Sequence, residues 1–407
     1  MPELKGMKFL KRKLNTKQSR ISTRYMFYEM KNIPFDFKIS TPPDLKGWFS
    51  TLGWCAKAVD SLSDRLQFRE FVDDNFDLNG IFQLNNPDIL FDSAILGALI
   101  CACSFIYIST DEDGFPRLQV IDGYNATGII DPFTNMLTEG YAVLSRDSNN
   151  KVVDEAYFTP DKTYFYNSGK FVNDIDNKAP FALLVPVIFK PDARRPFGHS
   201  RISRACMSIV GSALRTIKRS EIAAEFYSYP QKYVTGVSQD AEVLDKWQAT
   251  MSSMLTITKD EDGDHPVFGQ FQQQSMQPHT DQLRMFASLF AGETGLTLDD
   301  LGFATENPSS AEAIKASHEN LRLTARKAQR TFGSAFLNAG YLAACLRDDF
   351  PYRRNELYLT KPKWEPVFEP DAAMLSLIGD GAIKLNQGVP NYINKENLRD
   401  LTGIGDD

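Results

Sequence analysis

Histidine is scarce in this chain, and the motifs of the common nucleotide-dependent and hydrolytic enzymes are missing. The 407 residues include four histidines, none at the spacing of zinc ligands. Neither a G-x-x-x-x-G-K-[ST] phosphate loop nor a G-x-G-x-x-G turn after a strand is present. The G-x-S-x-G elbow is also missing, since Gly198-His199-Ser200 lacks the second glycine, and adjacent His199 and Ser200 rarely point at one another. We therefore expect no catalytic residue and no cofactor.

Two segments come close to metal-binding motifs and fail at defined positions. His318-Glu319 begins like a zinc helix, but Arg322 stands where the second histidine is needed. The acidic run Asp260–Asp264 begins like a calcium loop, yet its sixth and twelfth positions lack the required glycine and glutamate. We predict no metal site and interpret the acidic run as a solvated turn.

Cysteine is also infrequent, and long apolar runs are lacking. The five cysteines are odd in number and lie mostly in apolar segments, which indicates reduced thiols rather than a disulfide framework. The most apolar run, Leu96–Ile108, is too short to cross a bilayer and predicts a buried helix leading into a strand. The early basic residues Lys5, Lys8 and Lys11 precede no apolar stretch. We therefore expect a soluble protein without a signal peptide or a membrane partner.

The net charge bounds the possible partners. A formal charge of −7 argues against a protein that grips nucleic acid by neutralising its phosphates. The same charge suits the wall of a conduit, because a surface that repels phosphates lets a duplex slide. It is also common in ordinary soluble proteins. With 43% hydrophobic and 12% aromatic residues, the chain can bury a core in two or more sub-domains.

A long cationic helix follows a turn made by Pro196, Gly198 and Ser200, and Pro230 stops it. Apolar residues recur at spacings of three, four or seven and predict one buried stripe: Ile202, Cys206, Ile209, Ala213, Ile217 and Ala224. The cations that fall off the stripe are Arg201, Arg204, Arg215, Lys218 and Arg219. By itself this pattern is also typical of an ordinary surface helix.

A second helix pair lies further along the chain. One helix is predicted from about Thr280 to a glycine cap at Gly295, and an acidic loop follows over Leu298–Ser310. Ser309 and Glu312 then have capping-box spacing and predict the start of a helix that persists to Leu346. That helix would be about 55 Å long, more than a compact domain usually needs.

The remaining segments predict a mixture of helices and strands. We expect helices near Leu52–Phe71, Asp88–Cys103 and Val243–Leu255, and two short ones beginning near Asp371 and Asn394. Predicted strands are Phe105–Ile108, Arg117–Ile121, Tyr164–Tyr166, Tyr233–Gly236 and a stretch within Glu356–Phe368. Residues 1 to about 50 are polar, basic and aromatic, and we interpret them as a partly disordered arm.

The order of these segments resembles the portal proteins of tailed bacteriophages, in particular the siphophage-like branch. The resemblance is carried by the PFGHS turn before the cationic helix, the GETGLTLDDLGF segment and the NPSSAEAIKASHENL helix start. It extends from about Trp54 to Gly403. It implies an α+β fold with an α/β wing, two stem helices flanking a small α/β clip, a long wing helix and a small helical crown.

The resemblance also assigns parts of the chain. It implies, in order, 1–53 as N-terminal arm, 54–199 as first part of the wing, 200–229 as stem helix, 230–279 as clip, 280–297 as second stem helix, 298–310 as tunnel loop, 311–368 as long helix and rest of the wing, and 369–407 as crown. The tunnel-loop residues expected to face DNA are Asp299, Asp300, Glu306 and Asn307. The stem residues expected on the channel side are Arg215, Lys218 and Arg219.

Arg322, Arg326 and Arg330 recur every four residues on the long helix. They form either a solvated polar face or, as we hypothesise, a contact between subunits of a ring. The resemblance implies a non-enzymatic subunit of a homo-oligomeric ring, a dodecamer, at one capsid vertex of the virion, assembled in the bacterial host cytoplasm. Double-stranded DNA would pass through it during packaging and ejection. Its partners would be the terminase large subunit, the head–tail adaptor, and the major capsid and scaffolding proteins. The alternatives are another virion head or adaptor protein, or an α/β enzyme with an unrecognised site.

Overall fold

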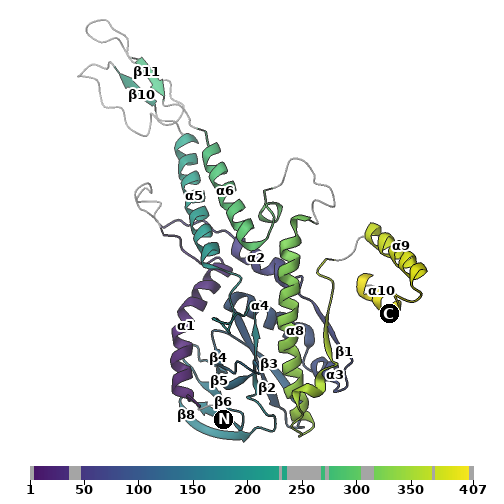
Figure 1. The fold of residues 1–407 in the computed structure, drawn as a ribbon. Helices are drawn as coiled ribbons and strands as arrows, with labels where there is room; N and C mark the ends of the chain where they lie inside the picture. Colours follow the sequence, from purple (N-terminus) through teal and green to yellow (C-terminus); the bar gives the residue numbers. More distant parts are fainter. Residues whose placement is uncertain are drawn as a thin grey trace, which may run out of the picture. The chain divides into compact units, whose positions relative to one another are not determined.

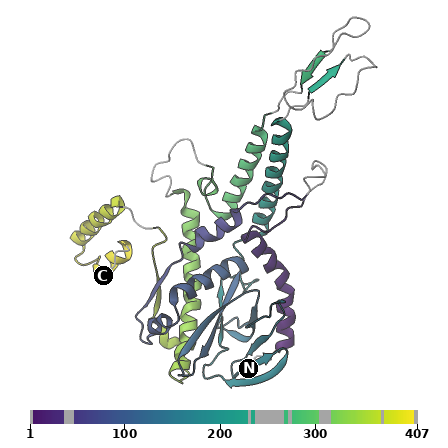
Figure 2. The ribbon, with the colours of Figure 1, turned by 180° about the vertical axis from the view of Figure 1, so that it is seen from behind.

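A computed structural model describes residues 4–35, 47–228, 232–235, 267–270, 275–303, 316–368 and 372–402 (Figures 1 and 2). The chain divides into two compact units. Unit 1 comprises Met1–Asn32, Gly53–Met207 and Ala291–Asp407, and unit 2 comprises Ile33–Leu52 and Ser208–Phe290. Helices and antiparallel strands both contribute, so the predicted α+β class is correct at that level. The finer division into wing, stem, clip and crown stays a prediction.

A three-stranded sheet with the order β3-β2-β9 forms the centre of unit 1. Helix α4 (Pro87–Cys101) ends where Ala102 takes a left-handed φ of 84°, and β2 (Cys103–Thr110) follows at once. Strands β3 (Pro116–Asp122) and β9 (Leu184–Ile188) pair with β2 on either side, antiparallel to it. Consecutive residues Phe105 and Ile106 of β2 are both buried, since both faces of the sheet are covered. The predicted helix-to-strand passage at Leu96–Ile108 is confirmed.

An antiparallel meander forms the second sheet of unit 1. Its strands, in spatial and chain order, are β4 (Ala126–Ile130), β5 (Leu137–Val143), β6 (Asp154–Phe158), β7 (Lys162–Asn167) and β8 (Lys170–Asp176). Ser168 and Gly169, with φ of 49° and 80°, make the two-residue turn between β7 and β8.

Helix α1 (Met7–Tyr28) packs on this sheet, so our interpretation of residues 1 to about 50 as a partly disordered arm is wrong over that helix (Figure 1). Leu10 and Leu14 join a buried cluster with the sheet residues Tyr141, Val143 and Tyr157. The backbone N–H groups of residues 5 and 6 donate to the carboxylate of Glu139 over 2.6 and 2.8 Å. The pattern was missed because few apolar positions are interspersed with many cations, whose long stems cover apolar surface.

The expected helix over Leu52–Phe71 is wrong in its second half. Helix α2 (Trp54–Ser63) stops, and β1 (Phe68–Val72) pairs antiparallel with β12 (Lys361–Trp364). Phe68 explains the strand, because its ring lies 4.4 Å from that of Phe91 and 5.3 Å from that of Trp364, centroid to centroid. Local periodicity cannot predict a strand whose pairing partner lies so far along the chain.

Helix α8 (Glu319–Arg347) is the long helix of unit 1 and contacts β2, β3, β9 and β12. Its 29 residues span about 43 Å; the predicted start at Ser309 and Glu312 lies outside the described residues. The other elements here are α3 (Leu78–Gln83), the short helices η2 (Asp299–Leu301) and η3 (Arg354–Leu357), α9 (Ala372–Gly388) and α10 (Lys395–Thr402). The last two confirm the helices expected near Asp371 and Asn394.

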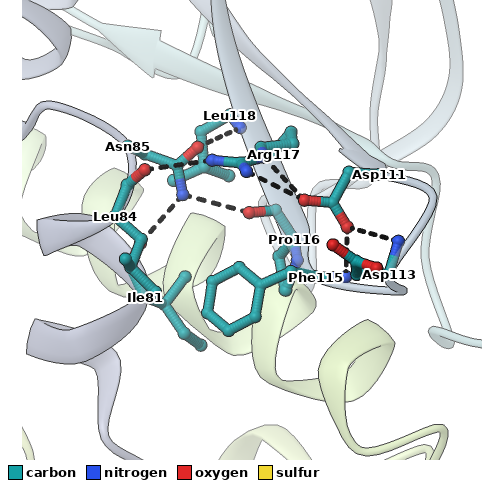
Figure 3. A network of polar contacts seen from close by, with 9 residues as sticks. All are labelled: Ile81, Leu84, Asn85, Asp111, Asp113, Phe115, Pro116, Arg117 and Leu118. Carbon is teal, nitrogen blue, oxygen red and sulfur yellow. Dashed lines mark hydrogen bonds and ion pairs between the residues drawn. The ribbon is translucent and has the colours of Figure 1, made fainter.

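Asn85, just after α3, fastens the outer strand β3 (Figure 3). Its amide nitrogen donates to the carbonyls of Ile81 and Pro116, and its amide oxygen accepts from the N–H of Leu118 at 2.9 Å. Arg117 donates to the carbonyl of Leu84 and pairs with Asp111 at 2.9 Å. Side chains thus supply hydrogen-bond partners for backbone groups of β3, an edge strand.

Unit 2 contains most of helix α5 (Arg204–Ser228) and of α6 (Gln277–Thr294), together with a two-stranded antiparallel ribbon. The ribbon pairs β10 (Lys232–Thr235), expected as a strand, with β11 (Val267–Gln270), which was not expected. The predicted helix Val243–Leu255 and the acidic run Asp260–Asp264 lie outside the described residues.

Three further findings concern the cysteines, the possible metal ligands and the helices of the described part of the chain. All five cysteines are free and buried. Burial raises the pKa of Cys101 to about 12 and that of Cys345 to about 11. Over the described ranges no three His, Cys, Asp or Glu side chains cluster as metal ligands would. No helix in those ranges has the length and apolarity that crossing a membrane requires.

Candidate functional site

The paired helices of unit 2 are the first candidate, and the apolar stripe predicted around α5 is buried in part. Val210, Ala213, Leu214 and Ile222 are buried, whereas Ala224 of the predicted stripe is exposed. Ile209 and Ile217 are half-buried. The prediction is thus confirmed at Ile202, Cys206 and Ala213, and the buried face also includes Val210, Leu214 and Ile222.

Helices α5 and α6 run side by side in unit 2 (Figures 1 and 2). The hydroxyl of Thr216 donates to the side-chain oxygen of Gln282 over 3.0 Å, which joins the two helices. On α6, Ala287 and Phe290 are buried. The helix ends at Thr294, and Gly295 follows with φ of 72°, so the predicted glycine cap is confirmed.

The three cations expected on the channel side have different environments. Lys218 is buried, and its ammonium group lies 5.3 Å from the centre of the Phe49 ring, a cation–π contact. Its side chain is therefore part of the packing of unit 2. Arg215 is half-buried and donates to Ser212 at 2.9 Å, and Arg219 is also half-buried. A channel-side role remains a prediction, and burial disfavours it for Lys218.

In unit 1 the PFGHS turn is built around Gly198. Gly198 has φ of 71°, and the N–H of His199 donates to the carbonyl of Phe189 at 2.9 Å. The Ser200 hydroxyl donates to the carbonyls of Leu99 and Ile100. The ring of His199 pairs instead with Asp192 at 2.6 Å. Ser200 and His199 thus have separate partners, and the turn is structural.

Directly after the turn, Arg201 is a buried cation that joins three segments of unit 1. Its backbone N–H donates to Leu99, and its guanidinium donates to the carbonyls of Ala58 and of Thr294, at the end of α6. A helix C-terminus attracts positive charge, so this pairing is favourable. Burial lowers the pKa of Arg201 to about 10, which leaves it protonated at neutral pH. The sequence pattern placed Arg201 off the apolar stripe and gave no signal of its burial.

The two aspartates in the described part of the acidic loop have different environments. The carboxylate of Asp300 accepts from the N–H and hydroxyl of Thr297, both at 2.9 Å, and Asp300 is half-buried. Asp299 is exposed. Asp300 therefore caps a turn, and the role of either aspartate in facing DNA stays a prediction. Glu306 and Asn307 lie outside the described residues.

The arginine row on α8 is also divided. Arg322 makes a two-pronged pair with Glu319, with both hydrogen bonds at 2.7 Å, and that guanidinium lowers the pKa of Glu319. Arg326 and Arg330 are exposed. The last two fit the hypothesis of an inter-subunit face better than Arg322 does.

Comparisons with known proteins confirm the resemblance inferred from the motifs. No protein-family model matches the chain. It is 24% identical over 348 residues to the portal protein of Mycobacterium phage L5, covering 79% of this chain and 70% of that one. It is 25% identical over 400 residues to the portal protein of Mycobacterium phage D29, covering 92% and 80%.

Two solved structures share a distant likeness. One comes from the neck of a native gene transfer agent particle computed with C12 symmetry, with a TM-score of 0.49, 12% identity and coverage of 95% of this chain and 99% of that one. The other comes from the virion of the native particle, with a TM-score of 0.48, 13% identity and coverage of 94% and 99%.

Proposed function

We propose that this chain is the portal subunit of a tailed phage, a structural protein rather than an enzyme, located at one capsid vertex of the virion. The observation that carries the proposal is its similarity to two portal proteins over most of its length. The paired helices and the strand ribbon of unit 2 support it, because they fit the expected stem and clip.

The subunits close into a ring, a dodecamer by resemblance. Each copy presents two different complementary patches, and such a heterologous contact closes only at one rotation. The exposed pair Arg326 and Arg330 belongs to one of these patches. The ring is assembled in the host cytoplasm with the major capsid and scaffolding proteins.

The ring encloses a channel for double-stranded DNA during packaging and ejection. A chain with a net charge of −7 holds phosphates weakly, so the duplex slides. Asp299 of the tunnel loop approaches the duplex and helps to keep it from slipping back. The clip, 230–279, binds the terminase large subunit during packaging and the head–tail adaptor afterwards.

Purified protein is expected to form closed rings with twelvefold symmetry. Native mass spectrometry gives the number of copies, and electron microscopy down the particle axis shows the central hole. A protein that stays monomeric under all assembly conditions would contradict the proposal. An open or solid assembly would favour another head or adaptor protein.

Reversing the charge at Arg326 is expected to weaken the ring. Arg326→Glu places a carboxylate where the neighbour presents acidic groups, and such like-charge contacts cost several kcal/mol. The protein concentration needed for half-assembly should rise about tenfold or more, measured by mass photometry. Lys327→Glu, at an adjacent exposed cation outside the four-residue row, is the matched control. Equal effects of the two variants would remove Arg326 from the interface.

A further inference from the structure

Unit 1 contains a cleft of about 670 Å³ whose lining is strongly positive. One wall is helix α1, and the others are the α4–β2 junction, strand β4 and the turn at 195–198. Its cationic lining residues are Arg12, Lys13, Lys17, Arg20, Arg24 and Arg195. We call this the cationic cleft.

No acidic side chain of the described residues is part of the lining of the cleft, although the carboxylate of Asp122 lies near enough to act on Lys17. Among the described residues of its lining, none is Asp or Glu, although the chain as a whole has a net charge of −7. Helix α1 itself has seven lysines and arginines and no acidic residue in its 22 positions. Positive charge is therefore concentrated here against the overall balance of the chain.

Backbone carbonyls hold three of these cations in place. The ammonium of Lys13 donates to Gly128 at 2.6 Å, that of Lys17 donates to Ala126 at 2.7 Å, and Arg24 donates to Cys101 at 3.1 Å. The Lys13 ammonium also lies 4.6 Å from the centre of the Phe197 ring. Carbonyls and rings fix the position of a cation without cancelling its charge, so the cleft is preorganised for an anion.

Burial disfavours the charged form of both lysines. Burial, with the nearby Lys17 as a smaller cause, lowers the pKa of Lys13 to about 8. Burial also lowers the pKa of Lys17, and the nearby carboxylate of Asp122 acts in the opposite direction. A bound anion would offset the lost hydration of both ammonium groups.

We propose that the cationic cleft binds adjacent phosphate groups, either of a free polyphosphate or of a nucleic-acid backbone. Six cations around one cleft call for several negative charges in a small volume, and neighbouring phosphates supply them at higher density than carboxylates. Arg12, Arg20 and Arg24 of α1 all line the cleft, and a guanidinium group can bind two phosphate oxygens at once. The inference goes beyond the proposed function and does not depend on ring formation.

The test uses the full-length protein and a double variant, Arg12→Gln with Arg20→Gln. Both arginines are exposed, whereas the packing face of α1 consists of Leu10, Leu14 and Ile21, so the fold is retained. The matched control is Lys8→Gln with Lys57→Gln, which removes the same charge from exposed positions outside the cleft. Thermal unfolding of each variant shows that the fold is intact.

Calorimetry with inorganic tripolyphosphate, and anisotropy with a fluorescein-labelled DNA duplex, measure binding. We expect the dissociation constant to rise about tenfold or more in the cleft variant and to stay within about twofold in the control. For DNA, the slope of log K against log salt should fall by about two in the cleft variant, because two arginines no longer neutralise phosphates.

The outcomes separate the possible ligands. Binding of tripolyphosphate alone identifies a free polyphosphate as the source, and binding of DNA alone identifies nucleic acid. A labelled polyglutamate peptide that binds as tightly as the phosphate probes would overturn the preference for phosphate. Absence of binding by both phosphate probes, or an equal loss in the control variant, would overturn the site itself.

Discussion

Replacing Gly198 by alanine is expected to destabilise unit 1 by more than about 3 kcal/mol. Gly198 has φ of 71°, and a Cβ atom there would stand 2.1 Å from the carbonyl oxygen of Phe189 and 2.8 Å from a side-chain carbon of Ile188. The backbone oxygen cannot move aside, because it accepts the N–H of His199. Urea unfolding followed by circular dichroism measures the loss.

Gly114→Ala is the control for backbone strain without the collision. Gly114 has φ of 79°, but a Cβ atom there would meet nothing within 4 Å. The Gly114→Ala variant should lower the free energy of unfolding by about 1 kcal/mol. Similar costs for the two variants would mean that strain alone, and not the close approach to Phe189, explains the glycine in the PFGHS turn.

Arg201→Met is expected to lower the free energy of unfolding by about 3–5 kcal/mol. Methionine fills much of the space but leaves the carbonyls of Ala58 and Thr294 without their donor. Arg201→Lys keeps the charge and can reach one carbonyl, so it should recover part of the loss. The free energy of unfolding from denaturant titration gives both values.

Arg204→Met tests whether the effect is specific to the buried cation. Arg204 lies three residues further on and is exposed, so its replacement should change stability by less than about 0.5 kcal/mol. If Arg201→Met were equally mild, the guanidinium would not join the three segments as described.

The sequence predicted those elements whose signals are local. The cap at Gly295, the helix before Cys101 and the last two helices each depend on residues within a few positions. The resemblance to portal proteins could also be recognised from short motifs, and two portal proteins match most of the chain.

What could not be predicted depends on partners distant in the chain. Strand β1 becomes a strand because β12 pairs with it, and Lys218 is buried because Phe49 covers it. The burial of Arg201 requires the end of α6 to supply a carbonyl. The few leucines of helix α1 are buried only because the helix packs on the second sheet. Periodicity within one segment contains none of this information.

The burial of the cysteine thiols has a practical consequence. Every native cysteine is buried, and burial raises the pKa of Cys101 and Cys345. Maleimide reagents should therefore not modify the native cysteines. A cysteine introduced at an exposed position such as Ser334 would then be the sole reactive handle in the chain. A fluorophore or crosslinker can be attached there without first removing any natural cysteine.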